Sequence, residues 1–152
     1  RPLFACVYNP ATDEAFYAEG GRGAYLNGMQ LPLRQPHGSL ADCVAGVDFK
    51  RIPRSLADRL ATRPPYYSQR NFGSSAIEWC FVAAGRLDLY LHGGQMLWDY
   101  AAGRLIRAGA GGCMCAPEHD DFDAADLWRR AVIGAAHPQA FKAWVEWLRA
   151  SS

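Results

Sequence analysis

Asp99 is the residue whose placement most suggests chemistry. A strand pattern over residues 87–91 is followed by a break at Gly93 and Gly94, and an apolar helix pattern then runs to about Ala110. Asp99 is therefore predicted to lie in the first turn of that helix. The free N–H groups and the positive dipole end of this turn favour an anion, and the carboxylate could also face a cation held over the helix entrance.

The same acid also has a purely structural interpretation. Acidic residues are common in first helical turns because they compensate the helix dipole, with or without a ligand. The neighbours favour a site instead, since Trp98 and the glycine-rich entry could form a wall that orients the carboxylate toward a metal. The small residues at 101–103 should let this helix lie close against a sheet, and Arg104 and Arg107 are expected to face solvent.

Strand and helix patterns alternate along the chain, which predicts α/β layering. Asn27 and Gly28 predict a hairpin turn, and Ser75 with Glu78 three residues later has the form of a capping box that starts a helix. The expected strands are residues 3–9, 14–19, 23–26, 43–49, 66–70, 87–91, 112–116 and 131–135, and the expected helices are residues 55–63, 73–84, the helix that carries Asp99, and one that begins at Pro138.

The amino-acid composition limits the classes of protein to which this chain can belong. A chain of 152 residues that is 50% hydrophobic is expected to be a single domain with a sizeable core. Its net charge of +1 argues against nucleic-acid or anionic-lipid partners, and it has no apolar run of roughly 20 residues that would span a membrane. Five scattered cysteines suit reduced thiols, so we expect a cytoplasmic protein. Because the chain opens at Arg1 directly into a strand pattern, it is expected to be part of a longer protein.

Five short blocks of this sequence follow one another in the order and spacing of a known protein family. They are residues 8–14 (Tyr-Asn-Pro-Ala-Thr-Asp-Glu), 21–28 (Gly-Arg-Gly-Ala-Tyr-Leu-Asn-Gly), Arg70 with 73–76 (Gly-Ser-Ser-Ala), 82–88 (Val-Ala-Ala-Gly-Arg-Leu-Asp) and 98–103 (Trp-Asp-Tyr-Ala-Ala-Gly). In this order and spacing the chain resembles the inositol monophosphatase family, whose specific signature is Trp-Asp-x-Ala-Ala-Gly. The resemblance covers nearly the whole chain.

This resemblance implies a magnesium-dependent phosphomonoesterase. The implied fold is the second half of an α/β/α/β/α sandwich, with residues 1–152 as one C-terminal part of the domain. Asp99 would ligate Mg²⁺, while Gly73, Ser74 and Ser75 would line the substrate pocket. Mg²⁺ prefers carboxylate and water oxygens and activates a water for in-line attack. The expected partner is a small phosphorylated substrate such as inositol monophosphate, and a homodimer remains an open expectation.

The sequence departs from the family in its metal ligands. The remaining ligands of the family come from a Gly-Glu-Glu segment and an Asp-Pro-x-Asp-Gly-Thr segment, and neither occurs here. We therefore expect the N-terminal metal-loop half to be absent and this chain alone to be inactive. The alternative is a catalytically incomplete relative that serves as a binding or oligomerisation module.

The second departure concerns the substrate. His92 stands seven residues before Asp99, where inositol-selective members carry a substrate-binding glutamate. An imidazole can donate or accept a hydrogen bond, so the substrate need not be an inositol phosphate; a histidine bonded to backbone at a strand end is the other interpretation. Arg70 could meet a substrate phosphate, although a structural role is favoured. For Ser74 and Ser75, helix capping is favoured over a nucleophilic role because the Gly-x-Ser-x-Gly elbow is missing.

Overall fold

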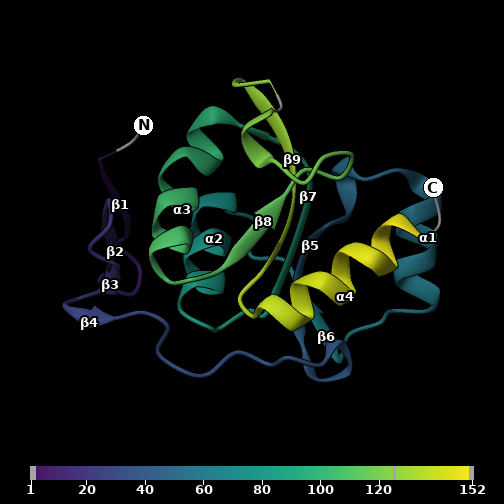
Figure 1. Cartoon of the computed structure of the whole chain (residues 1–152), viewed down its shortest axis with the longest axis horizontal. Coiled ribbons are helices and arrows are strands. Elements are labelled where there is room, and N and C mark those ends of the chain that lie inside the picture. Colours follow the sequence, from purple (N-terminus) through teal and green to yellow (C-terminus); the bar gives the residue numbers. More distant parts are fainter. Residues whose placement is uncertain (1–2, 125, 151–152) are drawn as a thin grey trace.

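The computed structural model of this chain describes residues 3–124 and 126–150. Two β-sheets lie on either side of a pair of helices, and a second pair of helices covers the outer face of the larger sheet (Figure 1). The helices are α1 (Arg54–Thr62), α2 (Ser75–Ala83), α3 (Leu97–Gly109) and α4 (Pro138–Arg149). The predicted α/β layering is confirmed.

The smaller sheet is an antiparallel meander in the order β1-β2-β3-β4. Its strands are β1 (Phe4–Asn9), β2 (Glu14–Glu19), β3 (Ala24–Leu26) and β4 (Met29–Gln30). Asn27 and Gly28 join β3 to β4 with φ angles of 47° and 86°, the left-handed conformation that a tight hairpin requires. The hairpin predicted from these two residues is therefore confirmed.

The larger sheet has the strand order β6-β5-β7-β9-β8. Its strands are β5 (Val44–Asp48), β6 (Ser68–Arg70), β7 (Leu89–Met96), β8 (Cys113–Cys115) and β9 (Arg129–Ala135). β5 is parallel to β6 and to β7, whereas β9 runs antiparallel to both of its neighbours. The carboxyl ends of β5 and β7 consequently meet at one edge of this sheet.

Three groups of buried apolar side chains join the layers. One lies between the small sheet and the pair α2 and α3, a second between these helices and the large sheet, and a third between the large sheet and the outer helices, where Trp144 and Leu60 are buried. In residues 3–124 and 126–150, no helix has both the length and the apolar character needed to cross a bilayer. The packing therefore fixes α2 and α3 between two sheets, with their N-terminal ends beside the carboxyl end of β7.

The break predicted at Gly93 and Gly94 is wrong, because β7 continues through both glycines to Met96 with an irregularity between His92 and Gln95. A Cβ atom at Gly93 would lie 1.6 Å from the carbonyl oxygen of Arg51. Glycine is required here for close packing of two backbones and does not mark the end of the strand.

The expected exposure of Arg107 is also wrong. This side chain is fully buried between α3 and the large sheet, whereas Arg104 one turn earlier is partly exposed and pairs with Asp123. Gly112 and Gly134 lie against Arg107, and a Cβ atom at Gly112 would come within 3.0 Å of its Cγ. Gly134 on β9 and Gly112 just before β8 therefore leave room for the guanidinium under the helix.

Candidate active site

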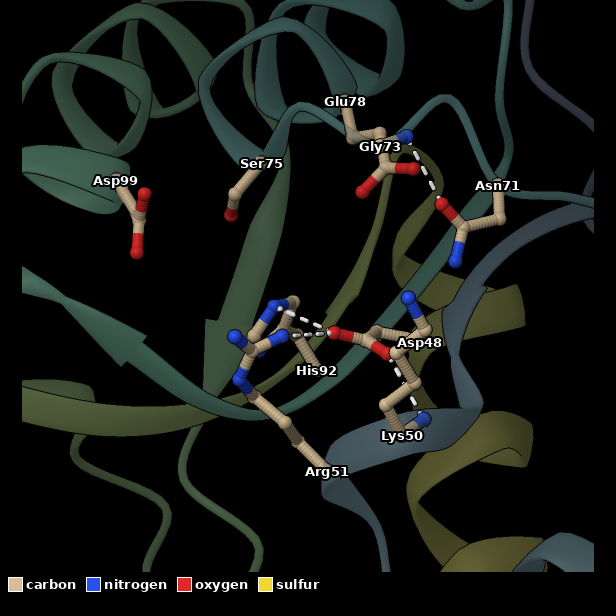
Figure 2. A pocket seen from close by; sticks show the side chains of 9 residues that line it. All are labelled: Asp48, Lys50, Arg51, Asn71, Gly73, Ser75, Glu78, His92 and Asp99. Atoms are coloured by element: carbon tan, nitrogen blue, oxygen red, sulfur yellow. Dashed lines mark hydrogen bonds and ion pairs between the residues drawn. The ribbon is translucent and has the colours of Figure 1, made fainter.

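A polar pocket of about 320 Å³ opens where β5 and β7 end and α2 and α3 begin (Figure 2). The site is thus formed by elements that are distant in the sequence and adjacent at one sheet edge. Its lining residues are Asp48, Lys50, Arg51, Asn71, Gly73, Ser75, Glu78, His92 and Asp99.

Asp99 lies in the first turn of α3, as the sequence predicted, and lines the pocket. Its Oδ2 accepts a hydrogen bond of 2.8 Å from the backbone N–H of Met96, which satisfies one free donor of the helix start and fixes the carboxylate. Trp98 is 69% exposed and is not one of the lining residues, so the wall expected from it does not form. Asp99 is placed by the helix itself.

Gly73 and Ser75 also line the pocket, but Ser74 does not. Gly73 has a φ of +75°, and its N–H donates to Asn71 Oδ1 at 2.9 Å, so the chain turns sharply into α2. The predicted capping box is wrong. Ser74 is the N-cap without a side-chain bond, and Ser75 Oγ instead lies 2.8 Å from Tyr90 Oη.

A buried chain of hydrogen bonds holds Ser75 from behind. Tyr90 Oη accepts from Gln95 Nε2 at 2.8 Å, and Gln95 Oε1 accepts from Trp79 Nε1 at 2.9 Å. Burial raises the pKa of Tyr90 far above its usual value, so its hydroxyl stays protonated. The start of α2 is thereby tied to β7, which fixes the serine at the pocket wall.

Arg70 does not line the pocket. Its guanidinium donates to Ser68 Oγ and to the carbonyl of Gln69, both at 2.6 Å, and the side chain is exposed at the end of β6. These contacts fit the structural role favoured from the sequence.

His92 lies directly opposite Asp48 in the parallel pairing of β5 with β7. The His92 Nε2 atom is 3.1 Å from Asp48 Oδ2, and His92 Nδ1 accepts from the N–H of Gly94 at 3.1 Å. Burial lowers the pKa of His92, against the opposing pull of Asp48. We therefore assign the neutral tautomer with the proton on Nε2, the nitrogen that faces the Asp48 carboxylate.

Asp48 is the centre of this cluster. Its Oδ1 accepts from the backbone N–H of Lys50 at 2.9 Å, and its Oδ2 accepts from Arg51 Nη1 at 2.8 Å and lies 3.1 Å from His92 Nε2 (Figure 2). Burial would raise the pKa of Asp48, but these hydrogen bonds and the nearby charge of Arg51 outweigh it and lower the pKa. Asp48 is consequently a carboxylate.

Glu78 is a second buried acid of the pocket. Its Oε1 accepts from the N–H of Phe72 at 2.8 Å. Burial raises its pKa, and the negative charge of Asp48 adds to the effect. Glu78 thus takes up a proton more readily than an exposed glutamate and can present either a donor or an acceptor to a ligand hydroxyl.

The sequence interpretation missed five residues of this pocket. A usable signal existed for one of them, since Asp48 ends a predicted strand and the carboxyl ends of neighbouring parallel strands form sites. Glu78 was recognised only as a cap. In the part of the chain that the structure covers, no three His, Cys, Asp or Glu side chains gather closely enough to hold a metal ion together. The missed residues are Asp48, Lys50, Arg51, Asn71 and Glu78.

Comparison with known proteins gives one consistent result. The sequence matches the model of the Inositol monophosphatase family over residues 1–150. It is 33% identical to Inositol monophosphatase 1 of Solanum lycopersicum, over 99% of this chain and 56% of the relative. It is 37% identical to Nus factor SuhB of Haemophilus influenzae, over 86% of this chain and 49% of that protein. The chain thus spans about half the length of the curated relatives it matches.

Solved structures agree on the fold. SaIMPase-II bound to inositol monophosphate superposes with a TM-score of 0.84 at 19% identity, covering 99% of this chain and 58% of the other. An IMPase of Thermotoga maritima superposes with a TM-score of 0.77 at 27% identity, covering 97% of this chain and 56% of the other.

Proposed function

Because the chain belongs to the inositol monophosphatase family, we propose that it is the C-terminal part of a magnesium-dependent phosphomonoesterase for a small sugar or polyol phosphate, such as inositol monophosphate. The observation that carries this proposal is Asp99, a carboxylate fixed at the start of α3 on the wall of a polar pocket. Pocket and carboxylate together suit a small, polar, phosphorylated ligand.

The chemistry of Asp99 fits Mg²⁺. This ion prefers carboxylate and water oxygens and keeps several waters, so one or two protein carboxylates serve as its ligands. Asp99 Oδ2 accepts one hydrogen bond, from the N–H of Met96, so the carboxylate keeps acceptor sites with which it could bind a cation. When bound, Mg²⁺ would supply activation of water and stabilisation of the leaving oxygen. In the proposal, further oxygen ligands come from an N-terminal half that this chain does not include.

The remaining pocket residues orient the substrate in this proposal. Gly73 and Ser75 form the turn into α2 and stand beside the leaving group, while Ser74 and Arg70 flank the pocket without lining it. Glu78 has a raised pKa, so its Oε2 can carry a proton and donate a hydrogen bond to a ligand hydroxyl, or accept a hydrogen bond from that hydroxyl when ionised. No residue of this chain is assigned as general acid or nucleophile.

The alternative function is a catalytically incomplete binding or oligomerisation module. The observation that favours it is the lack of any group of three potential side-chain ligands in residues 3–124 and 126–150. A metal response of the full-length protein distinguishes the two functions, because a module would release no phosphate.

The test uses the full-length protein that carries this chain, with phosphate release from a panel of phosphomonoesters measured with and without Mg²⁺. Asp99→Asn should lower Mg²⁺-dependent turnover by about 100-fold or more, because the isosteric amide removes the ligand charge and leaves the fold intact. Asp58→Asn, a change of an exposed aspartate on α1, is the matched control and should behave as wild type. Unchanged turnover of Asp99→Asn would remove this residue from the metal site, and silence of the wild type on every ester would favour the module.

A further inference from the structure

The pocket wall formed by the segment after β5 carries two cations. Lys50 and Arg51 both line the pocket, and the Arg51 side chain is 51% exposed although Asp48 beside it is 10% exposed. Only Nη1 of Arg51 has a protein partner among the described residues, namely Asp48 Oδ2. A guanidinium has five N–H donors, so most of its donors remain free to meet a ligand in the pocket.

The backbone of Arg51 is held in place by β7. Gly93 packs so closely against the Arg51 carbonyl that any side chain at Gly93 would collide with it. The ion pair with Asp48 fixes the other end of the residue. Arg51 is therefore anchored at its backbone and at its guanidinium, which reduces the entropy lost when a ligand binds.

His92 has no nitrogen left for a substrate. Nδ1 accepts from Gly94 and Nε2 lies 3.1 Å from Asp48 Oδ2, so both ring nitrogens face groups of the protein. Asp48 in turn accepts two hydrogen bonds and lies against His92 Nε2, which together cover most of the roughly four acceptor sites of a carboxylate. The free hydrogen-bonding capacity of this wall thus consists mainly of cationic donors.

We propose that Arg51 is the specificity-determining residue of this pocket and that it receives a second anionic group, a carboxylate or a phosphate, on the leaving group of the substrate. His92 is a positioning residue in this arrangement, because it holds Asp48, which in turn holds Arg51. The inference takes the class of substrate from the proposed function. Its test does not depend on that function, since anion binding can be measured without turnover.

Two ligand pairs separate the two kinds of anion. Glucitol 6-phosphate and 6-phosphogluconate differ by a carboxylate in place of a hydroxymethyl group, and glucose 1-phosphate and glucose 1,6-bisphosphate differ by a phosphate. Binding of each to the full-length protein is measured by titration calorimetry in EDTA, so that no ester is hydrolysed. In at least one pair the ligand that carries the second anionic group should bind about tenfold more tightly than its partner, as expected for a charge-assisted hydrogen bond at a partly exposed arginine.

Arg51→Gln should abolish that preference, while Arg54→Gln, a change of an exposed arginine at the start of α1, should keep it. Equal binding within both pairs, no binding of any of the four ligands, or a preference that survives Arg51→Gln would each overturn the inference. If the binding preference is observed but no ester releases phosphate with Mg²⁺, the proposed function is refuted and the role of Arg51 in anion binding is retained.

The positioning role of His92 has its own readout. His92→Leu should reduce the preference several-fold without changing the affinity for the ligand that lacks the second anion, because only the support of Asp48 is lost. His92→Gln should restore part of the preference, since its amide can donate to Asp48. If His92→Leu weakened both members of a pair equally, His92 would be a general structural residue and its positioning role would be refuted.

Discussion

Two regions of the molecule bury ionisable side chains, and they differ in how these groups are paired. At the carboxyl ends of β5 and β7, Asp48 receives hydrogen bonds from Lys50 and Arg51 and contacts His92 Nε2 at 3.1 Å. Under α3, Arg107 is completely buried, yet among the described residues it has one acceptor, the carbonyl of Ala135, and its Nε and Nη1 have none. Its guanidinium also lies 5.7 Å from the centre of the Trp79 ring.

The hydrogen bonds of the Asp48 cluster fix the geometry of its side chains, whereas the poorly paired charge of Arg107 lowers the stability of the fold. A buried carboxylate with two hydrogen bonds and a facing imidazole is fixed in direction and recovers its lost hydration. A buried guanidinium with most donors unpaired does not, and burial lowers the pKa of Arg107 to about 9. We therefore expect substitutions in the two regions to change stability in opposite directions.

The largest effect is expected at Arg107. Arg107→Met keeps most of the side-chain volume and removes the poorly paired charge, so the free energy of unfolding of the full-length protein should rise by about 3 kcal/mol. Urea unfolding at neutral pH measures this change. Arg104→Met on the same helix, which removes a partly exposed ion pair with Asp123, should change stability by less than about 1 kcal/mol. A loss of stability in Arg107→Met would mean that the arginine is paired in solution, and the contrast between the two regions would disappear.

A smaller effect of opposite sign is expected at Asp48. Asp48→Ala leaves the backbone N–H of Lys50 and Nη1 of Arg51 without their acceptor and removes the carboxylate that faces the buried His92, which should cost about 2 kcal/mol. Asp58→Ala on exposed α1 is the control and should change little. If the two variants unfolded at the same urea concentration, the cluster would be dispensable for stability and the comparison would rest on Arg107 alone.

The smallest effect is a pH dependence that belongs to Arg107. Its folded pKa of about 9 lies below its usual value, so between these two values the unfolded chain binds more protons than the folded one. The stability gap between Arg107→Met and wild type is thus fully present below pH 9 and should narrow by about 1 kcal/mol for each pH unit above it. Urea unfolding of both proteins from about pH 8 to about pH 10.5 measures the gap. A constant gap would show that the charge of Arg107 is not what destabilises the fold.

Local patterns predicted the elements and one side of the site. The hairpin at Asn27 and Gly28 and the place of Asp99 in the first turn of α3 both follow from residue types a few positions apart. The same reasoning failed at Gly93, because a glycine can indicate either a turn or a close contact between backbones. Only the neighbouring backbone of Arg51 shows that Gly93 is of the second kind.

The sequence by itself determined the layered α/β class, the family resemblance and the carboxylate at the helix start, since each depends on periodicity or on short blocks of residues. Only the tertiary structure decided the partners of these groups. The pairing of β5 with β7 sets Asp48 beside His92, and Asp48 in turn holds Arg51 at the pocket. In the other region, Gly112 and Gly134 leave room for Arg107 under α3. Strand register and interlayer packing join residues far apart in the chain, and no local pattern encodes which of them will meet.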